Sequence, residues 1–212
     1  ELLQLFPSLT AARKNAAKRL EKSVLEQLKH LGMKDARFAV KIEAEEARDG
    51  DFSLKVKGRP LKIFNSGLDR VEFLLSGNEG EDLAPLTKVA SGGEISRIML
   101  ALKAALASRD KVPIMVFDEI DVGIGGETAW GVAEKLREVS RTCQCLCITH
   151  LPQIAAFADG HFRVTKEASS GRTVIKVLPL DRKARVDEIA RMLGGSNSAS
   201  RRHAKDLLKR AL

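Results

Sequence analysis

Two adjacent carboxylates follow a short apolar run near the middle of the chain. Ile114–Phe117 is apolar throughout, and Asp118 and Glu119 come directly after it. The run predicts a buried strand, and ligands of open α/β sheets bind at the carboxyl ends of strands. Adjacent carboxylates repel each other, so the pair favours a nearby cation or reacting water. An Asp that helps to hold Mg²⁺ and a Glu that activates water would suit nucleotide hydrolysis. The alternative is a solvated loop.

A glycine pair precedes a predicted helix. Ser91, Gly92, Gly93 and Glu94 come before an apolar stripe formed by Ile95, Ile98, Met99, Leu102 and Leu106. Glycines let backbone N–H groups approach an anion closely, and both the serine hydroxyl and the helix dipole favour a negative ligand there. The motif therefore predicts a phosphate contact. The alternative is a serine N-cap followed by flexible glycines.

A histidine follows a second predicted strand. His150 ends the apolar run at residues 145–149, as Asp118 ends the earlier one. If the two strands are neighbours, the imidazole and the carboxylates share one edge of the sheet, where a neutral histidine can hydrogen-bond a γ-phosphate or the attacking water. The alternative is a structural histidine at a strand end.

The elements around these residues alternate between helix and strand. A loop with Gly123, Gly125 and Gly126 leads from the first strand into a helix with Ala129, Ala133 and Leu136 on one face. Helix, strand, helix, strand is typical of a parallel α/β sheet. The fold class predicted is α/β, with a mainly parallel sheet flanked by helices.

The first 75 residues predict a long helix and a β-rich section. A stripe at three- and four-residue spacing predicts a helix over 9–31 that ends at Gly32, and it fits either a core-packed helix or the root of a coiled coil: Leu9, Ala12, Ala16, Leu20, Val24, Leu28 and Leu31. Apolar residues alternate at 38–42 and 52–56 on either side of an Asp49-Gly50 turn, and 71–75 predicts another strand.

The remaining segments predict connections and a C-terminal helical region. Residues 76–85 predict a loop, and 162–166 with 173–178 predict a hairpin around Ser169-Ser170-Gly171. Two short helices are expected near 184–193 and 199–211, the second with Ser196 or Ser198 as its N-cap.

Composition narrows the class of partner. The formal net charge of +8 favours an acidic partner such as DNA, although many basic domains bind no nucleic acid. No apolar run approaches the roughly 20 residues that span a bilayer, so no membrane partner is expected. Cys143, Cys145 and Cys147 lack the spacing of a zinc site and predict small core residues on one strand face, in a reducing cytoplasm.

The order of these motifs resembles the C-terminal half of an ABC-type ATPase head. Ser91 to Glu94 resemble the signature motif, and residues 114–118 resemble the Walker B strand. The resemblance implies ATP and Mg²⁺ as cofactors. It implies ATP-binding roles for Ser91, Gly92, Gly93, Glu94 and the D-loop Asp121, a water-mediated Mg²⁺ contact for Asp118, and catalytic roles for Glu119 as general base and His150 as switch histidine.

Residues 89–103, 117–126 and 149–153 resemble, more narrowly, the RecN family of bacterial DNA double-strand-break repair proteins, which are related to the structural-maintenance-of-chromosomes (SMC) family. The resemblance implies a cytoplasmic protein of the bacterial nucleoid that handles DNA through ATP-driven dimerisation of its heads. Residues 1–34 would be a coiled-coil stub and 35–212 the C-terminal half of the head.

One motif of this resemblance is missing. The chain contains no G-x-x-x-x-G-K-[ST] phosphate loop, which in the family lies near the N-terminus of the full protein. The N-terminal half of the same protein is therefore an expected partner, and this segment alone is expected to hydrolyse ATP poorly.

Two other hypotheses remain open. The chain could be a non-catalytic DNA-binding or scaffold module, with phosphate contacts from the basic C-terminal residues Arg182, Lys183, Arg185, Arg201, Arg202 and Lys205. It could also be the head of another SMC-like chromosome-maintenance ATPase, although the glycines at 123–126 disfavour this.

Overall fold

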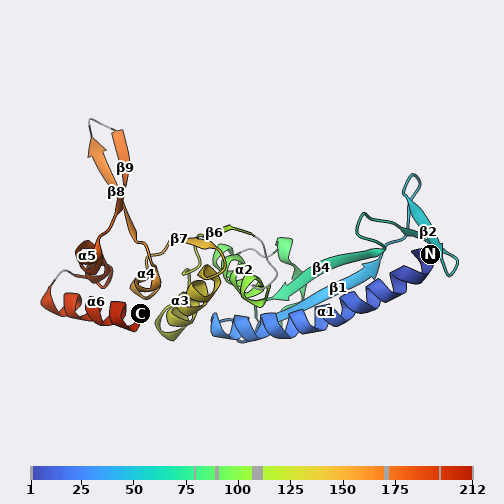
Figure 1. Cartoon of the computed structure of the whole chain (residues 1–212), viewed down its shortest axis with the longest axis horizontal. Helices are drawn as coiled ribbons and strands as arrows, with labels where there is room; N and C mark the ends of the chain where they lie inside the picture. Colours follow the sequence, from blue (N-terminus) through green and yellow to red (C-terminus); the bar gives the residue numbers. More distant parts are fainter. Residues whose placement is uncertain are drawn as a thin grey trace. The chain divides into compact units, whose positions relative to one another are not determined.

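The computed structural model describes residues 2–78, 80–88, 91–106, 112–169, 172–195 and 197–211. Two compact units divide the chain, Glu1–Ala105 and Leu106–Leu212. Both combine helices with β-strands (Figure 1), in agreement with the α/β class. None of the helices in these described ranges has the length and apolarity required to cross a bilayer.

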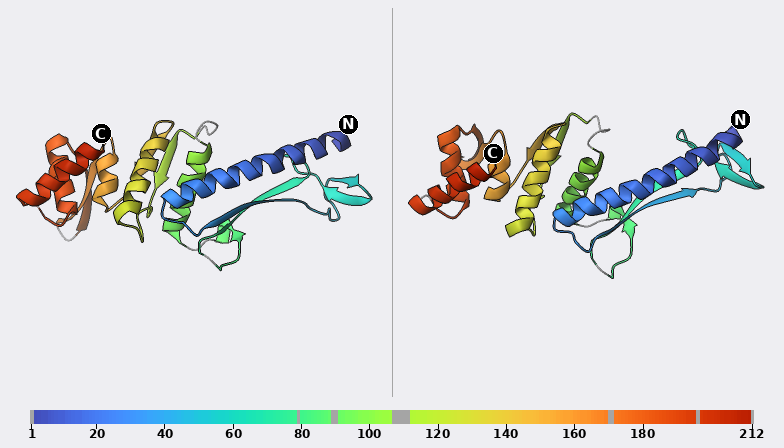
Figure 2. Two further views of the ribbon diagram at one scale, coloured as in Figure 1. Left: turned by 90° about the horizontal axis from the view of Figure 1, so that it is seen from below. Right: turned by 60° about the horizontal axis from the view of Figure 1, so that its bottom comes forward.

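In the first unit a long helix lies along an antiparallel sheet. Helix α1 (Leu2–His30) lies along β1 (Arg37–Ala44), which pairs with β4 (Asp69–Ser76) (Figures 1 and 2). The short β5 (Ala84–Pro85) pairs with β4 and extends the sheet. Thr10 and Arg13 of the helix each donate a hydrogen bond of 2.8 Å to the Asp69 carboxylate. These polar contacts hold the N-terminal half of α1 against β4.

The predicted apolar stripe of α1 is correct only in its second half. Val24, Leu28 and Leu31 are buried, whereas Leu9, Ala12 and Ala16 are exposed. Asp69 contributes to the difference, because Thr10 and Arg13 face the sheet to reach it, and Ala12 and Ala16 then lie outward. The helix ends at His30, close to Gly32, whose φ of 78° lies in the left-handed region that favours glycine.

The sequence pattern of the β-rich section did not specify how its strands pair. Strand β2 (Ser53–Val56) pairs with β3 (Arg59–Lys62) and not with β1, although Gly50 does adopt a turn conformation with φ 87°. Strand β3 was not predicted, because Arg59 and Pro60 break the alternation of apolar residues. The predicted loop at 76–85 contains the end of β4 and the short β5.

A 3₁₀ turn, η1 (Leu86–Lys88), precedes α2 (Gly92–Leu106), which begins where the glycine pair predicted. Ile98 and Leu102 are buried as expected. The other members of the predicted stripe, Ile95, Met99 and Leu106, are about 40% exposed, so this face of α2 is uncovered.

The second unit contains the predicted parallel strands. Strand β6 (Ile114–Phe117) pairs in parallel with β7 (Gln144–Cys147), and α3 (Gly126–Ser140) connects them. Ala129, Ala133 and Leu136 are buried on α3, as predicted. Strand β6 was expected to be buried, but Ile114 and Val116 are 52% and 64% exposed. Leu146 of β7, the partner of Val116, is 48% exposed, so within the described residues one face of this two-stranded sheet lacks a covering layer.

The rest of this unit consists of a hairpin and three helices that pack together. Strands β8 (Phe162–Ser169) and β9 (Arg172–Pro179) form the predicted hairpin; Ser170 and Gly171 of its turn lie outside the described residues. The short α4 (Pro152–Phe157), which was not predicted, packs with α5 (Arg182–Met192) and α6 (Ser198–Arg210) around Ala155, Ile189 and Leu207. Asn197 caps α6 instead of Ser198, and Ser196 lies outside the described residues.

Candidate functional site

The carboxyl ends of β6 and β7 meet at one edge. Phe117 is in register with Cys147, and the Ile148 N–H donates to the Phe117 carbonyl at 2.9 Å. Asp118 and Glu119 therefore leave the sheet at the edge where His150 also leaves it. The structure brings together the acidic and imidazole groups that the sequence placed there. We call this group, Asp118, Glu119, Asp121, Thr149 and His150, the strand-end cluster.

Asp121 joins the two halves of the strand-end cluster. Its side chain is 4% exposed, and its Oδ2 accepts hydrogen bonds from the His150 backbone N–H at 2.8 Å and the Thr149 hydroxyl at 2.5 Å. The same oxygen lies 3.0 Å from His150 Nδ1. A carboxylate accepts hydrogen bonds, so this distance favours a proton on Nδ1, which would leave Nε2 of a neutral imidazole as an acceptor. The imidazole is 73% exposed and is therefore open to a ligand.

Sequence reasoning did not assign Thr149. Its hydroxyl donates to Asp121 and accepts from the Leu151 N–H at 3.0 Å, so it ties the end of β7 to the start of α4. Its position beside His150 was the one signal that could have identified it.

The backbone at Glu119 is strained. Glu119 has a φ of 57°, a left-handed conformation that costs a non-glycine residue on the order of 1 kcal/mol or more. Its N–H donates to the Asp118 carboxylate at 2.9 Å, and its carbonyl accepts from the Val122 N–H at 3.0 Å. This turn carries the chain from the exposed Asp118 and Glu119 to the buried Asp121.

The acids of the cluster do not form a complete metal cage. Across the described ranges, no three or more His, Cys, Asp or Glu side chains are arranged to hold a metal ion. Mg²⁺, however, is usually held by one or two carboxylates together with substrate phosphates and water. The exposed carboxylate of Asp118 fits that kind of site.

The predicted phosphate contact belongs to the first unit. Ser91 Oγ accepts from the Glu94 N–H at 3.4 Å, which is the N-cap interaction of α2. Gly92 is exposed and Gly93 is buried. The Glu94 carboxylate lies over Gly77, where an added Cβ would be 3.7 Å from it. The N-cap alternative is thus present, and it leaves the exposed start of α2 able to meet an anion.

The three cysteines lie along the half-buried face of β7 and its approach, as their spacing predicted. Cys143 Sγ and Cys145 Sγ are 3.9 Å apart, and all three thiols are free. Burial raises the pKa of Cys145 and of Cys147 to about 12. Both thiols are therefore protonated at neutral pH, which favours a packing role.

The basic C-terminal residues divide into two groups. Arg185 donates to the carbonyls of Ala155, Ala156 and Ala158, where it caps α4. Arg201 pairs with Asp187 at 2.9 Å. These two arginines have intramolecular roles, whereas four others of the predicted DNA-contacting set are exposed: Arg182, Lys183, Arg202 and Lys205.

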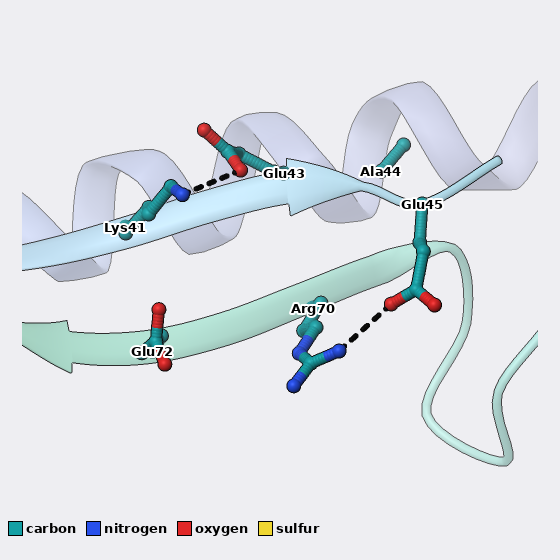
Figure 3. Close-up of a pocket in the computed structure, with 6 residues that line it drawn as sticks. All are labelled: Lys41, Glu43, Ala44, Glu45, Arg70 and Glu72. Atoms are coloured by element: carbon teal, nitrogen blue, oxygen red, sulfur yellow. Dashed lines mark hydrogen bonds and ion pairs between the residues drawn. The ribbon is translucent and has the colours of Figure 1, made fainter. Parts of the chain in front are cut away.

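A pocket on the β1–β4 sheet was not predicted (Figure 3). Lys41 pairs with Glu43 at 2.9 Å, and Arg70 pairs with Glu45 at 2.8 Å. The Glu43 partner raises the pKa of Lys41, and the Glu45 partner raises that of Arg70. Each cation is matched by an anion and Glu72 adds a third carboxylate, so this surface has no excess positive charge to attract an anion.

Comparison with known proteins identifies close relatives. The chain is 43% identical over 206 residues to DNA repair protein RecN of Bacillus subtilis, covering 96% of this chain and 36% of that protein. It is 44% identical over 211 residues to RecN of Treponema pallidum, covering 99% and 35%. The chain thus spans about a third of the length of these relatives. No protein-family model matches it.

Solved structures agree on the fold. The Smc head domain with a coiled coil and joint from Pyrococcus yayanosii matches with a TM-score of 0.54 and 21% identity, over 85% of this chain and 30% of that one. The Smc head domain with an extended coiled coil from Pyrococcus furiosus matches with a TM-score of 0.52 and 18% identity, over 89% and 42%. At these identities the likeness shows the fold, that of an α/β head segment.

Proposed function

The chain belongs to the RecN family of DNA repair proteins, and we propose that it supplies the C-terminal half of an ATP-hydrolysing head. One observation supports this most strongly: Asp121 holds His150 beside the Asp118–Glu119 turn, at the carboxyl edge of parallel strands. Nucleotides bind at such an edge in open α/β folds.

The strand-end cluster suits phosphoanhydride hydrolysis. Bound Mg²⁺ would neutralise charge on the β- and γ-phosphates, and Asp118 would hold it through water. Glu119 would accept a proton from the water that attacks the γ-phosphorus. His150 Nε2, the free acceptor, would hold that water, or would contact a γ-phosphate oxygen if protonated. Asp121 would keep the imidazole in place, and this positioning role is more specific than the ATP contact expected from its D-loop resemblance.

The start of α2 suits the other face of a composite site. Ser91, Gly92, Gly93 and Glu94 would meet the γ-phosphate bound to an opposing head, and the phosphate loop would come from the N-terminal half of the same protein. ATP would then favour a homodimer of heads, because both faces gain contacts only while the γ-phosphate is present.

An exposed seam on α1 supports the coiled-coil part of the proposal. Leu5, Leu9, Ala12 and Ala16 are exposed at spacings of four, three and four residues, as in the a and d positions of a heptad. A second helix would cover this seam. Residues 1–34 would then be the coiled-coil stub and 35–212 the head, in a DNA-handling protein of the cytoplasm and nucleoid.

Reconstitution from two fragments tests the proposal. The chain is co-expressed with a fragment of a relative that carries the phosphate loop, and ATP turnover and ATP-dependent dimerisation are measured. We expect both to appear in the complex and neither in the separate fragments. A complex that forms but neither binds nor hydrolyses ATP would refute the proposal.

The rival scaffold function is not favoured, because it leaves the strand-end cluster without a role. It would regain support if ATP turnover were absent from the complex and salt-sensitive DNA binding mapped to the exposed C-terminal cations.

A further inference from the structure

One face of α1 carries a row of lysines. Lys14, Lys18, Lys22 and Lys29 are all exposed. At 100° per residue, their spacings of four, four and seven place them within an arc of about 80°, over a length of about 22 Å. We call this row the lysine stripe.

The stripe carries charge of a single sign. No described carboxylate lies within ion-pair distance of its four ammonium groups. The neighbouring Glu21 is engaged, because it accepts the Val40 N–H at 2.7 Å. The exposed Glu26 lies beside the row, four residues after Lys22, and offsets part of the repulsion at that end. The first three lysines of the row are like charges four residues apart, which destabilise a helix, so this part of the row has a cost that an anionic partner would offset. The pocket on the adjoining sheet (Figure 3) differs, because each of its two cations is paired with a carboxylate.

The stripe stays open when the other faces of α1 are covered. The buried residues Ala17, Val24 and Leu28 point toward the sheet. On a regular helix the stripe is turned from them by about 105°, and from the apolar seam at Leu5 to Ala16 by about 145°. A helix packed on the seam would therefore leave the lysines accessible.

We infer that the lysine stripe binds the phosphate backbone of duplex DNA. Duplex DNA is a straight rod with one negative charge per roughly 1.7 Å of axis, and successive lysines of the stripe rise by about 6, about 6 and about 10.5 Å along a straight helix. Single-stranded nucleic acid is disfavoured, because its binding sites rely on aromatic side chains that stack on bases, and none lies within this arc of α1 between Lys14 and Lys29. The inference rests on the DNA-handling part of the proposed function and is independent of the nucleotide site.

Salt-dependent binding of the full chain tests the inference, without nucleotide. A labelled duplex of about 30 base pairs is titrated between about 50 and about 200 mM KCl, and affinity is measured by fluorescence anisotropy. The variant Lys14→Gln/Lys18→Gln/Lys22→Gln/Lys29→Gln should lower the slope of log affinity against log salt by about 3 to 4. Lys18→Gln alone should lower it by about 0.9. Glutamine matches lysine in helix propensity, so α1 should be retained, as checked by circular dichroism.

The matched control removes four exposed cations elsewhere, Arg182→Gln/Lys183→Gln/Arg202→Gln/Lys205→Gln, and should leave the slope unchanged. The inference is overturned if the wild-type chain does not bind the duplex, if both variants lose the same slope, or if the stripe serves single-stranded DNA more tightly. Because no ATP is present, these outcomes are distinct from failure of the ATPase proposal, which the two-fragment turnover measures.

Discussion

The strand-end cluster and the start of α2 differ in how far the chain itself completes them. At the cluster, Asp121 is buried and holds both Thr149 and His150, so the groups proposed for chemistry are preorganised. At α2, Ser91 makes only a 3.4 Å contact to the Glu94 N–H, beside an exposed Gly92. The difference indicates that the groups proposed for chemistry are positioned within this chain, whereas the groups proposed to contact phosphate need a ligand from outside it. Activity is to be measured in the complete protein, in which both halves of the proposed head are present.

Replacement of Asp121 should have a larger effect than three other replacements, those of Ser91, Arg185 and Cys147. Asp121→Asn keeps the shape but offers an amide that can donate toward Nδ1, so the imidazole is no longer held in one tautomer. We expect turnover to fall by about 10²-fold or more, as measured by steady-state phosphate release. Thr149→Val, which removes one partner of Asp121 and leaves the His150 contacts, should cost much less. Equal losses in the two variants would contradict the positioning role.

The phosphate-contacting role of Ser91 can be separated from its capping role. Ser91→Asp keeps an N-cap acceptor but places a negative charge where the γ-phosphate would approach. We expect ATP-dependent dimerisation to weaken by at least about tenfold, measured by sedimentation. Ser91→Asn keeps the cap without the charge and should retain most of it. Unchanged dimerisation in the aspartate variant would leave Ser91 with its capping role alone.

Arg185 should matter for stability more than for chemistry. Its guanidinium donates to three carbonyls at the end of α4, and hydrogen bonds from a charged group are worth about 1.5 to 3 kcal/mol. Arg185→Met should lower the free energy of unfolding by about 2 kcal/mol, measured by urea denaturation. Arg182→Met, at an exposed position, should change it by less than about 0.5 kcal/mol. Similar values for both would remove Arg185 as a cap of α4.

The thiol of Cys147 on β7 should have the smallest effect, which concerns its reactivity and the stability of the chain at high pH. Burial raises the pKa of Cys147 from 9.0 to about 12, so at a pH of about 8 its alkylation should be at least about 100-fold slower in the folded protein than in urea. Above pH 9 the unfolded thiol loses its proton while the folded one keeps it, so stability should fall as pH rises toward 12. Cys147→Ala should reduce that fall. Rapid alkylation of Cys147 itself in the folded chain would contradict the burial of this thiol.

The sequence predicted the strand-end cluster because strand ends are local features. Apolar runs that end in Asp118 and His150, with a helix between them, imply parallel strands with their acids and imidazole at one edge. The contact from Asp121 to His150 could not be predicted, since it depends on the left-handed turn at Glu119. A non-glycine residue gives no sequence signal for that conformation.

Tertiary partners account for the incorrect predictions. Hydrophobicity indicated that β6 should be covered but not what covers it, and Val116 is 64% exposed in this chain. Likewise, the apolar pattern of α1 could not reveal Asp69, which is distant in sequence and draws Thr10 and Arg13 inward. The pairing of β1 with β4, and not with the nearer β2, likewise depends on residues distant in the sequence.

The proton-accepting role of Glu119 is the most direct test of the proposed ATPase. Glu119→Gln keeps the size and turn of the residue but removes its basicity. In the complete protein, single-turnover hydrolysis of radiolabelled ATP should fall by about 10²- to 10⁴-fold, while ATP binding and ATP-dependent dimerisation persist. Hydrolysis near the wild-type rate, with ATP binding intact, would contradict the proposed chemistry of the strand-end cluster.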